Sequence, residues 1–262
     1  MWKASIAVAL ALWTAGAGAA AELKSETIAA FDSYIRTTEA RIADQVSGKR
    51  SFLWTDESPQ RRDLVRKGQI VVQPWNSRGE VQVPSGLIHD WIGSVFIPGV
   101  SLEKVLALVQ NYDNHYKIYQ PEVIRSRILQ HDGNHYKIYL QLLKKKILTV
   151  VLNTEYDVNY YPLGATRMYS RSYSTRIAEV ENAGERGERE VPGDEGHGFM
   201  RRLYSYWRFE ERDGGVYMEC QAVSLTRDIP TGLGWLIEPI IRDLPKESLM
   251  RTLEGTRQAL KK

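Results

Sequence analysis

The chain has 262 residues, 43% of them hydrophobic, and its 35 Lys and Arg against 32 Asp and Glu give a formal net charge of +3 at pH 7. A chain of this size can bury one sizeable core, and so balanced a charge argues against nucleic acid as the main partner. Cys220 is the single cysteine, which excludes an internal disulfide, so the core itself must hold the fold.

The first residues have the composition of a secretory signal peptide. Lys3 precedes an apolar run from Ile6 to Trp13, and small residues follow up to Ala21. The run is short for a membrane span, which takes about 20 apolar residues. No cysteine lies near the cleavage site, which excludes a lipoprotein. We therefore expect residues 1–21 to be removed and the protein to be exported, periplasmic or secreted; an uncleaved anchor is the alternative.

Residues 22–87 are interpreted as an N-terminal helical extension. Apolar residues at helical spacing predict a helix over 22–47 that ends at Gly48, and a short strand over 69–73 follows a connection. A separate domain of about 65 residues without metal or disulfide would be marginal. The extension is therefore expected to belong to the same domain as residues 88–262.

The next pattern is strand, helix and strand. Residues 91–97 form the first strand, and Ser101 is placed to cap the helix, in which four apolar residues face inward: Leu102, Val105, Leu106 and Val109. The second strand, 123–130, ends at Asp132 and Gly133, a strong hairpin signal.

Residues 135–161 contain neither Gly nor Pro, yet the chain must reverse within them. At about 3.3 Å per residue a single strand would run for roughly 90 Å, far beyond a normal sheet. The polar run Lys144–Lys146 is the available turn. Alternation then points one set of side chains inward: Tyr136, Ile138, Leu140, Leu142, and on the return Leu148, Val150, Leu152, Thr154, Tyr156 and Val158.

Two further strands and a last one complete the predicted sheet. Strands over 167–180 and 199–210 flank a Gly-rich, charged loop, 181–198, without apolar periodicity. In the second of these, one face carries Leu203, Ser205, Trp207 and Phe209. The last strand has one mostly small face: Met218, Cys220, Ala222, Ser224 and Thr226. A small face leaves room for a helix to lie close.

A long amphipathic helix follows. Asp243 is placed as its N-cap and Pro245 in its first turn, while Pro239 and the preceding glycines predict a broken approach. Four residues form its buried stripe: Leu249, Leu253, Thr256 and Leu260.

A last strand leading to a C-terminal helix after a long antiparallel meander resembles the START-like superfamily. The phrases WIGSVFIPGVSLEKVLALVQNYDNHYKIYQPEVIRSRIL and SLTRDIPTGLGWLIEPI carry the resemblance, which spans Leu87 to Leu260. These are the polyketide-cyclase and lipid-transport relatives (SRPBCC), including coenzyme Q-binding proteins. The resemblance implies an α+β helix-grip fold, in which about seven strands curve around the C-terminal helix, with 88–262 as the ligand-binding domain.

Aromatic residues near the predicted inner faces are candidates to line a cavity. Trp91, Tyr112, Tyr156 and Trp207 each combine a large apolar body with one polar group, which suits an amphipathic or aromatic ligand; the alternative is that they fill the core. Tyr119 lies in a segment that resembles the START-like connection beside the cavity mouth.

Three further candidates are Arg171, Arg227 and Trp235. Each arginine lies in a strand-like run and could anchor a ligand, or could be a surface cation or half of an ion pair. Trp235 lies beside aliphatic residues, at the end that gates the cavity and can touch a membrane in START-like proteins. The run Lys144–Lys146 could add weak attraction to anionic lipid. A buried helix start is the alternative.

No motif indicates a metal, a cofactor or catalysis. His131 and His135 flank a turn, but no further ligand is placed to complete a zinc site. Nucleophile elbow, Walker, dinucleotide and zinc-protease motifs are missing from the sequence. We expect no cofactor, no metal and no catalytic residue.

Three functions remain open. The first is binding, with or without transport, of a hydrophobic ligand such as a lipid, quinone or polyketide, with transient membrane-surface contact and no nucleic acid. The second is a cyclase- or hydrolase-like enzyme in which Arg171, Tyr156 or His89 polarises a carbonyl or moves a proton. The third is an envelope scaffold that holds a partner with its N-terminal helix and the 181–198 loop.

Overall fold

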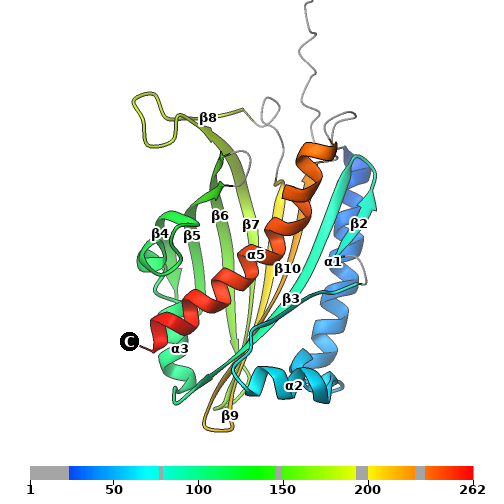
Figure 1. The fold of residues 1–262 in the computed structure, drawn as a ribbon, viewed down its shortest axis with the longest axis vertical. Coiled ribbons are helices and arrows are strands. Elements are labelled where there is room, and N and C mark those ends of the chain that lie inside the picture. The colour runs from blue at the N-terminus through cyan, green and yellow to red at the C-terminus, as the bar shows by residue number, and fades with distance from the viewer. Residues whose placement is uncertain (1–23, 77–78, 146–148, 193–199, 228–233, 262) are drawn as a thin grey trace, which may run out of the picture.

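The computed structural model describes residues 24–76, 79–145, 149–192, 200–227 and 234–261, and the backbone alone for 234–243. Within these residues the fold is a curved antiparallel sheet with helices on both faces (Figure 1). The expected signal peptide, residues 1–21, lies outside the described residues.

The strands are β1 (Val71–Pro74), β2 (Glu80–Val83), β3 (Gly86–Pro98), β4 (Val123–Asp132), β5 (His135–Lys145), β6 (Thr149–Pro162), β7 (Arg167–Glu181), β8 (Arg189–Glu190), β9 (Arg202–Arg212) and β10 (Gly215–Arg227). The helices are α1 (Ser25–Val46), α2 (Pro59–Arg66), α3 (Leu102–Val109), α4 (His115–Ile118) and α5 (Gly234–Leu260), with short 3₁₀ turns η1 (Trp54–Glu57) and η2 (Tyr112–Asn114).

The described part of the sheet has ten strands, in place of the expected seven or so. Its order is β1-β3-β10-β9-β7-β6-β5-β4, with β2 also on β3 and β8 on β7. The short strands β1 and β2 come from the N-terminal segment and pair along the edge of β3 that β10 leaves free. The three additional strands, β1, β2 and β8, are therefore short pieces, and the seven long ones form the expected helix-grip sheet around α5.

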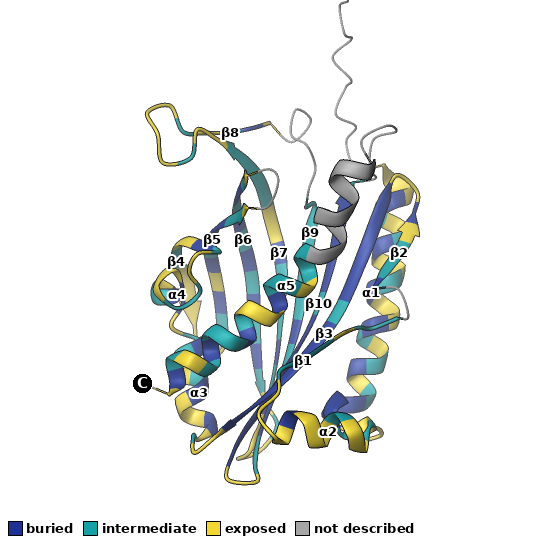
Figure 2. Ribbon diagram, viewed as in Figure 1, coloured by how far each residue is buried: buried dark blue, intermediate teal, exposed yellow. Residues whose placement is uncertain are grey.

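The two faces of the sheet have different covers. α5 packs against β1, β3 and β10 and against α3, on the concave face (Figure 1). The opposite face is covered by α1, whose stripe Phe31, Ile35 and Ile42 packs with Tyr206 and Leu225. Because both faces are covered, β3 and β10 are buried along almost their whole length (Figure 2).

The helix α1 confirms the prediction for 22–47, and its apolar stripe is covered by the sheet. The third hypothesis, in which this helix holds a partner, therefore lacks a free apolar face on the described α1. The expected connection before residue 69 instead contains α2, with Pro59 at its start and the Ser58 hydroxyl accepting a hydrogen bond from the Arg61 N–H.

The expected start of the C-terminal helix at Asp243 is wrong. The backbone is helical from Gly234 and continues through Pro239 and Pro245. Proline has a helical φ and removes one hydrogen bond, so a helix that packs on a sheet can contain it. The predicted stripe is confirmed, since Leu249, Leu253, Thr256 and Leu260 are all buried.

Part of the expected loop 181–198 is also ordered against the sheet. β8 pairs with the end of β7, and Glu188 forms an ion pair with Arg125 of β4 at 2.8 Å. Charged residues of this segment thus find partners on strands far away in sequence, which local periodicity does not reveal.

Candidate ligand cavity

A cavity of about 680 Å³ lies between α5 and the sheet. α5 packs on β3 and β10, whereas the cavity is lined by side chains of β5, β6, β7 and β9 as well. Most of the predicted inward residues of β5 and β6 line it: Ile138, Leu140, Leu142, Val150, Leu152, Tyr156 and Val158. Tyr136 and Thr154, also predicted to point inward, are buried but do not line it. Leu148 lies outside the described residues.

Small side chains form the floor of the cavity. Ser172 on β7 is the register partner of Ser205 on β9, and Ser205 is the partner of Ala222 on β10. All three line the cavity. Because none of them reaches far from the sheet, the space above this row stays unfilled. The small face predicted for the last strand is thus part of a wider small patch.

The helix α5 comes close to the sheet beside this patch at Gly93. A Cβ atom at Gly93 would lie 2.7 Å from Leu253 Cδ1 and 3.0 Å from Val72 Cγ2. A side chain at Gly93 would therefore press on Leu253, so its absence lets α5 lie close to β3.

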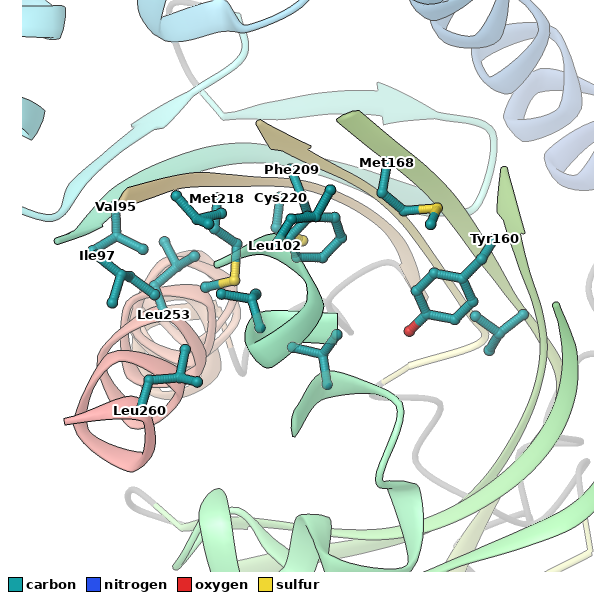
Figure 3. Close-up of a cluster of buried hydrophobic side chains, with 14 of the residues drawn as sticks. Val95, Ile97, Leu102, Tyr160, Met168, Phe209, Met218, Cys220, Leu253 and Leu260 are labelled. Carbon is teal, nitrogen blue, oxygen red and sulfur yellow. The ribbon is translucent and has the colours of Figure 1, made fainter. Parts of the chain in front are cut away.

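An aromatic cluster closes the cavity near α3. The hydroxyl groups of Tyr112 and Tyr160 are 2.7 Å apart, and both side chains are buried. Figure 3 shows Tyr160 reaching from β6 toward the interior, beside the core formed by β9, β10 and α5. His115 lies next to Tyr112, with ring centroids 4.7 Å apart, and its Nε2 is 3.0 Å from the Val109 carbonyl oxygen. Burial lowers the pKa of His115 to about 4.

Tyr119 and Tyr156 also line the cavity. Tyr119 lies 3.0 Å from the Thr256 hydroxyl, which donates to the Thr252 carbonyl at 2.9 Å. Burial raises the pKa of Tyr119 to about 12, and burial likewise raises that of Tyr156 to about 12. Both stay protonated at neutral pH.

A polar cluster, the rim cluster, lies where α5 meets the start of β4 and the end of β5. It borders the opening of the cavity, because its member Arg251 both lines the cavity and is exposed to solvent. Lys144 Nζ is 2.6 Å from Glu122 Oε2 and 2.6 Å from the Ser248 hydroxyl. Arg251 reaches the other oxygen of Glu122 at 3.4 Å. These residues are not among the predicted site residues. The sequence pattern could have identified Lys144, because this residue continues the inward alternation of Ile138, Leu140 and Leu142.

Four of the eight predicted site residues line the cavity: Tyr112, Tyr119, Tyr156 and Trp207. Trp91 is on the same face as Ala222 but is not a lining residue, since its ring packs near Gly79. The helix backbone includes Trp235, whose side chain lies outside the described residues.

The placement expected for Arg171 and Arg227 is wrong. Ser170 and Ser172 point into the cavity, so alternation turns Arg171 to the opposite face, where its guanidinium lies over the rings of Tyr161 and Tyr173. Arg227 likewise alternates with the inward Thr226 and does not line the cavity.

The described residues contain no group of three or more His, Cys, Asp and Glu side chains that could hold a metal ion. His131 Nε2 lies 2.7 Å from the Gly133 carbonyl oxygen, and His135 Nε2 lies 2.9 Å from Asp157. No helix in the described part of the chain is both long enough and apolar enough to cross a bilayer.

Neither a family model nor a curated protein matches the sequence. Solved structures with a similar chain path include TTHA0849 from Thermus thermophilus, with 15% identity over 64% of this chain and 94% of that chain and a TM-score of 0.47. A STAR-related lipid transfer protein from Xanthomonas axonopodis shares 16% identity over 74% of this chain and 99% of that one, with a TM-score of 0.47. The Zhui aromatase/cyclase from a Streptomyces species shares 10% identity over 66% and 94%, with a TM-score of 0.45.

Proposed function

We propose that this protein binds a hydrophobic small molecule, such as a lipid, quinone or polyketide-like compound, in the cavity between α5 and the sheet, and that it transports this ligand. The observation that carries the proposal is the cavity itself, of about 680 Å³. Small-molecule sites typically measure about 300–1,000 Å³ and are mostly apolar with a few polar groups. The aliphatic and aromatic lining, with hydroxyl groups on the floor and at the aromatic end, meets that description.

The proposal is tested by asking whether the cavity is occupied. Protein purified from its own host is analysed by native mass spectrometry and by organic extraction, beside the variant Ser205→Leu. Leucine at Ser205 would extend from the small floor into the cavity, so the bound compound should be lost while the fold is kept.

Thr175→Leu is the matched control, because Thr175 is an exposed strand residue that does not line the cavity. It should retain the ligand. A wild-type protein that is reproducibly empty, or a Ser205→Leu variant that keeps its ligand in full, contradicts binding in this cavity.

The cyclase- or hydrolase-like alternative has less support from the geometry. Of the three side chains considered for it, Tyr156 lines the cavity, whereas Arg171 is on the opposite face and His89 is buried at a hydrogen bond with Thr226, 3.0 Å away. The three groups are thus not gathered around one reacting centre.

Export completes the proposal. The leader composition of residues 1–21 supports a periplasmic or secreted location, and transient contact with a membrane surface would let a hydrophobic ligand enter and leave. N-terminal sequencing of protein from the host envelope fraction tests export: a mature chain that begins near Glu22 supports it, and an intact Met1 in the cytosol contradicts it.

A further inference from the structure

The hydroxyl pair of Tyr112 and Tyr160 has one hydrogen more than it uses. Two hydroxyl groups carry two protons, and the 2.7 Å contact between the oxygens uses one of them. Among the residues that the structure describes, neither oxygen has another hydrogen-bond partner. Both side chains are more than nine-tenths buried and both line the cavity. One donor therefore faces the cavity without an acceptor.

The third tyrosine near α5 differs in this respect. Thr256 donates its proton to the Thr252 carbonyl, so Tyr119 must be the donor in its contact with Thr256. The proton of Tyr119 is thereby used. A buried donor without an acceptor costs free energy, which a ligand oxygen at the tyrosine pair would recover.

The charged residues that line the cavity indicate that the ligand oxygen at the tyrosine pair is uncharged. Among the described lining residues the carboxylates and their cations are paired: Glu122 with Lys144 and Arg251, and Glu254 with Arg257. No described cation lies at the aromatic end to offset an ionised group, which would be costly to bury there. Burial raises the pKa of both Tyr112 and Tyr160, which keeps them protonated donors.

We propose that the Tyr112–Tyr160 pair is a donor site for a neutral acceptor oxygen, such as the carbonyl of a ketone, quinone or ester, carried on the inner end of the ligand. The site rests on the proposed function, because it requires a molecule in the cavity. In it one tyrosine donates to the other, and the second donates to the ligand, an arrangement in which each hydrogen bond strengthens the next.

The test compares two probes of nearly equal shape, fluorenone and fluorene, which differ by a carbonyl in place of a methylene. Dissociation constants are measured by competition with a fluorescent dye in the cavity. For each variant we take the ratio of the fluorenone dissociation constant to the fluorene dissociation constant. Contributions from ligand shape, and most of those from solvation, are the same for the two probes and cancel in this ratio.

The decisive variant is Tyr112→Phe/Tyr160→Phe, since either single replacement leaves a hydroxyl that can still donate. Its ratio should rise by roughly 3- to 10-fold over wild type, the size of one lost hydrogen bond. Tyr119→Phe is the matched control: it also removes one hydroxyl from the lining, but one already in use, and its ratio should equal that of wild type.

An unchanged ratio in the double variant, or an equal rise in Tyr119→Phe, overturns the donor site and leaves ligand binding intact. Failure of fluorene to bind the wild-type protein instead counts against the cavity as a binding site, and so against both proposals. If the double variant does not fold, the infrared carbonyl band of fluorenone bound to wild type decides. A shift to lower wavenumber than in hydrocarbon solvent that persists in the Ser172→Ala/Ser205→Ala variant supports the site. A band that is unshifted, or whose shift is lost in that variant, overturns it.

Discussion

Glu219 on β10 links the N-terminal segment to the sheet through a single buried carboxylate. It accepts hydrogen bonds from the backbone N–H groups of Trp54 at 2.8 Å and Thr55 at 2.7 Å, and from the Thr55 hydroxyl. Arg208 lies 3.4 Å away, and both charged side chains are fully buried. The energetic consequence is asymmetric, because removing one partner leaves the other charge buried alone.

Replacement of Glu219 by alanine should therefore lower the free energy of unfolding by about 3–5 kcal/mol, measured by urea denaturation. Lys49→Ala serves as the control, since its ion pair with Asp44 is exposed and should contribute less than about 1 kcal/mol. Equal losses in the two variants would show that burial does not determine the strength of the Glu219 network.

The buried histidines predict the pH dependence of stability. Burial lowers the pKa of His89 and of His115 from 6.5 to about 4. Between these values the unfolded chain binds more protons, so stability falls as the pH drops from 6.5 to 4, by roughly 1 kcal/mol per pH unit for each histidine. Burial raises the pKa of Asp90 from 3.8 to about 6, and this opposes the effect in that window.

The contribution of one histidine is isolated by His115→Gln. Its free energy of unfolding, measured at pH 7 and at pH 5, should fall less on acidification than that of wild type. An identical drop in the two proteins would mean that His115 does not stay neutral in the fold.

At the scale of the elements, α5 is joined to the sheet edge by the rim cluster. Lys144 lies near the end of β5, Glu122 precedes β4, and Ser248 and Arg251 belong to α5. The cluster thus ties three segments together where exposed side chains border the cavity. Moving α5 away from this rim would require Arg251 to leave Glu122 and Ser248 to leave Lys144.

Glu122→Gln should consequently weaken the hold on α5, lowering the free energy of unfolding by about 1–3 kcal/mol and accelerating ligand release. Stopped-flow dissociation of a cavity-bound dye measures the release. Lys246→Ala is the control on the same helix, because Lys246 is exposed and does not line the cavity. Equal release rates in the two variants would show that the rim cluster does not slow the release of the ligand.

On the scale of the whole molecule, the N-terminal extension packs on the face of β9 and β10 that is turned away from the cavity. Tyr206, Val223 and Leu225 are each fully buried beneath it, together with the Arg208–Glu219 pair. A chain that begins at residue 86 would expose these apolar groups and leave buried charges without their backbone partners.

We therefore expect an 86–262 chain to aggregate or to lack a cooperative thermal transition, whereas a 24–262 chain keeps a cooperative transition. Circular dichroism on heating measures both. A cooperative transition in the shorter chain would contradict the expectation that 22–87 and 88–262 form one domain.

Much of the fold was predictable because its signals are local. The alternation in β5 and β6, the hairpin at Asp132 and the stripe of α5 all depend on neighbours a few residues away, and all are confirmed. The same alternation could have placed Ser170, Ser172 and Lys144 at the cavity. For Arg171, a charge inside a strand suggested a ligand anchor, but the alternation of the strand places this side chain on the face opposite the cavity.

By itself, the sequence determined the succession of the long strands along the chain, the inward faces of β5 and β6 and the buried side of the last helix, since residues only two to four positions apart set these features. Only the tertiary structure decided that Ser172, Ser205 and Ala222 meet in one row, that Tyr112 and Tyr160 share a hydrogen bond, and that Glu122 joins Lys144 to α5. These contacts join strands and helices far apart in the chain, and their geometry depends on sheet register and curvature, which no local pattern specifies.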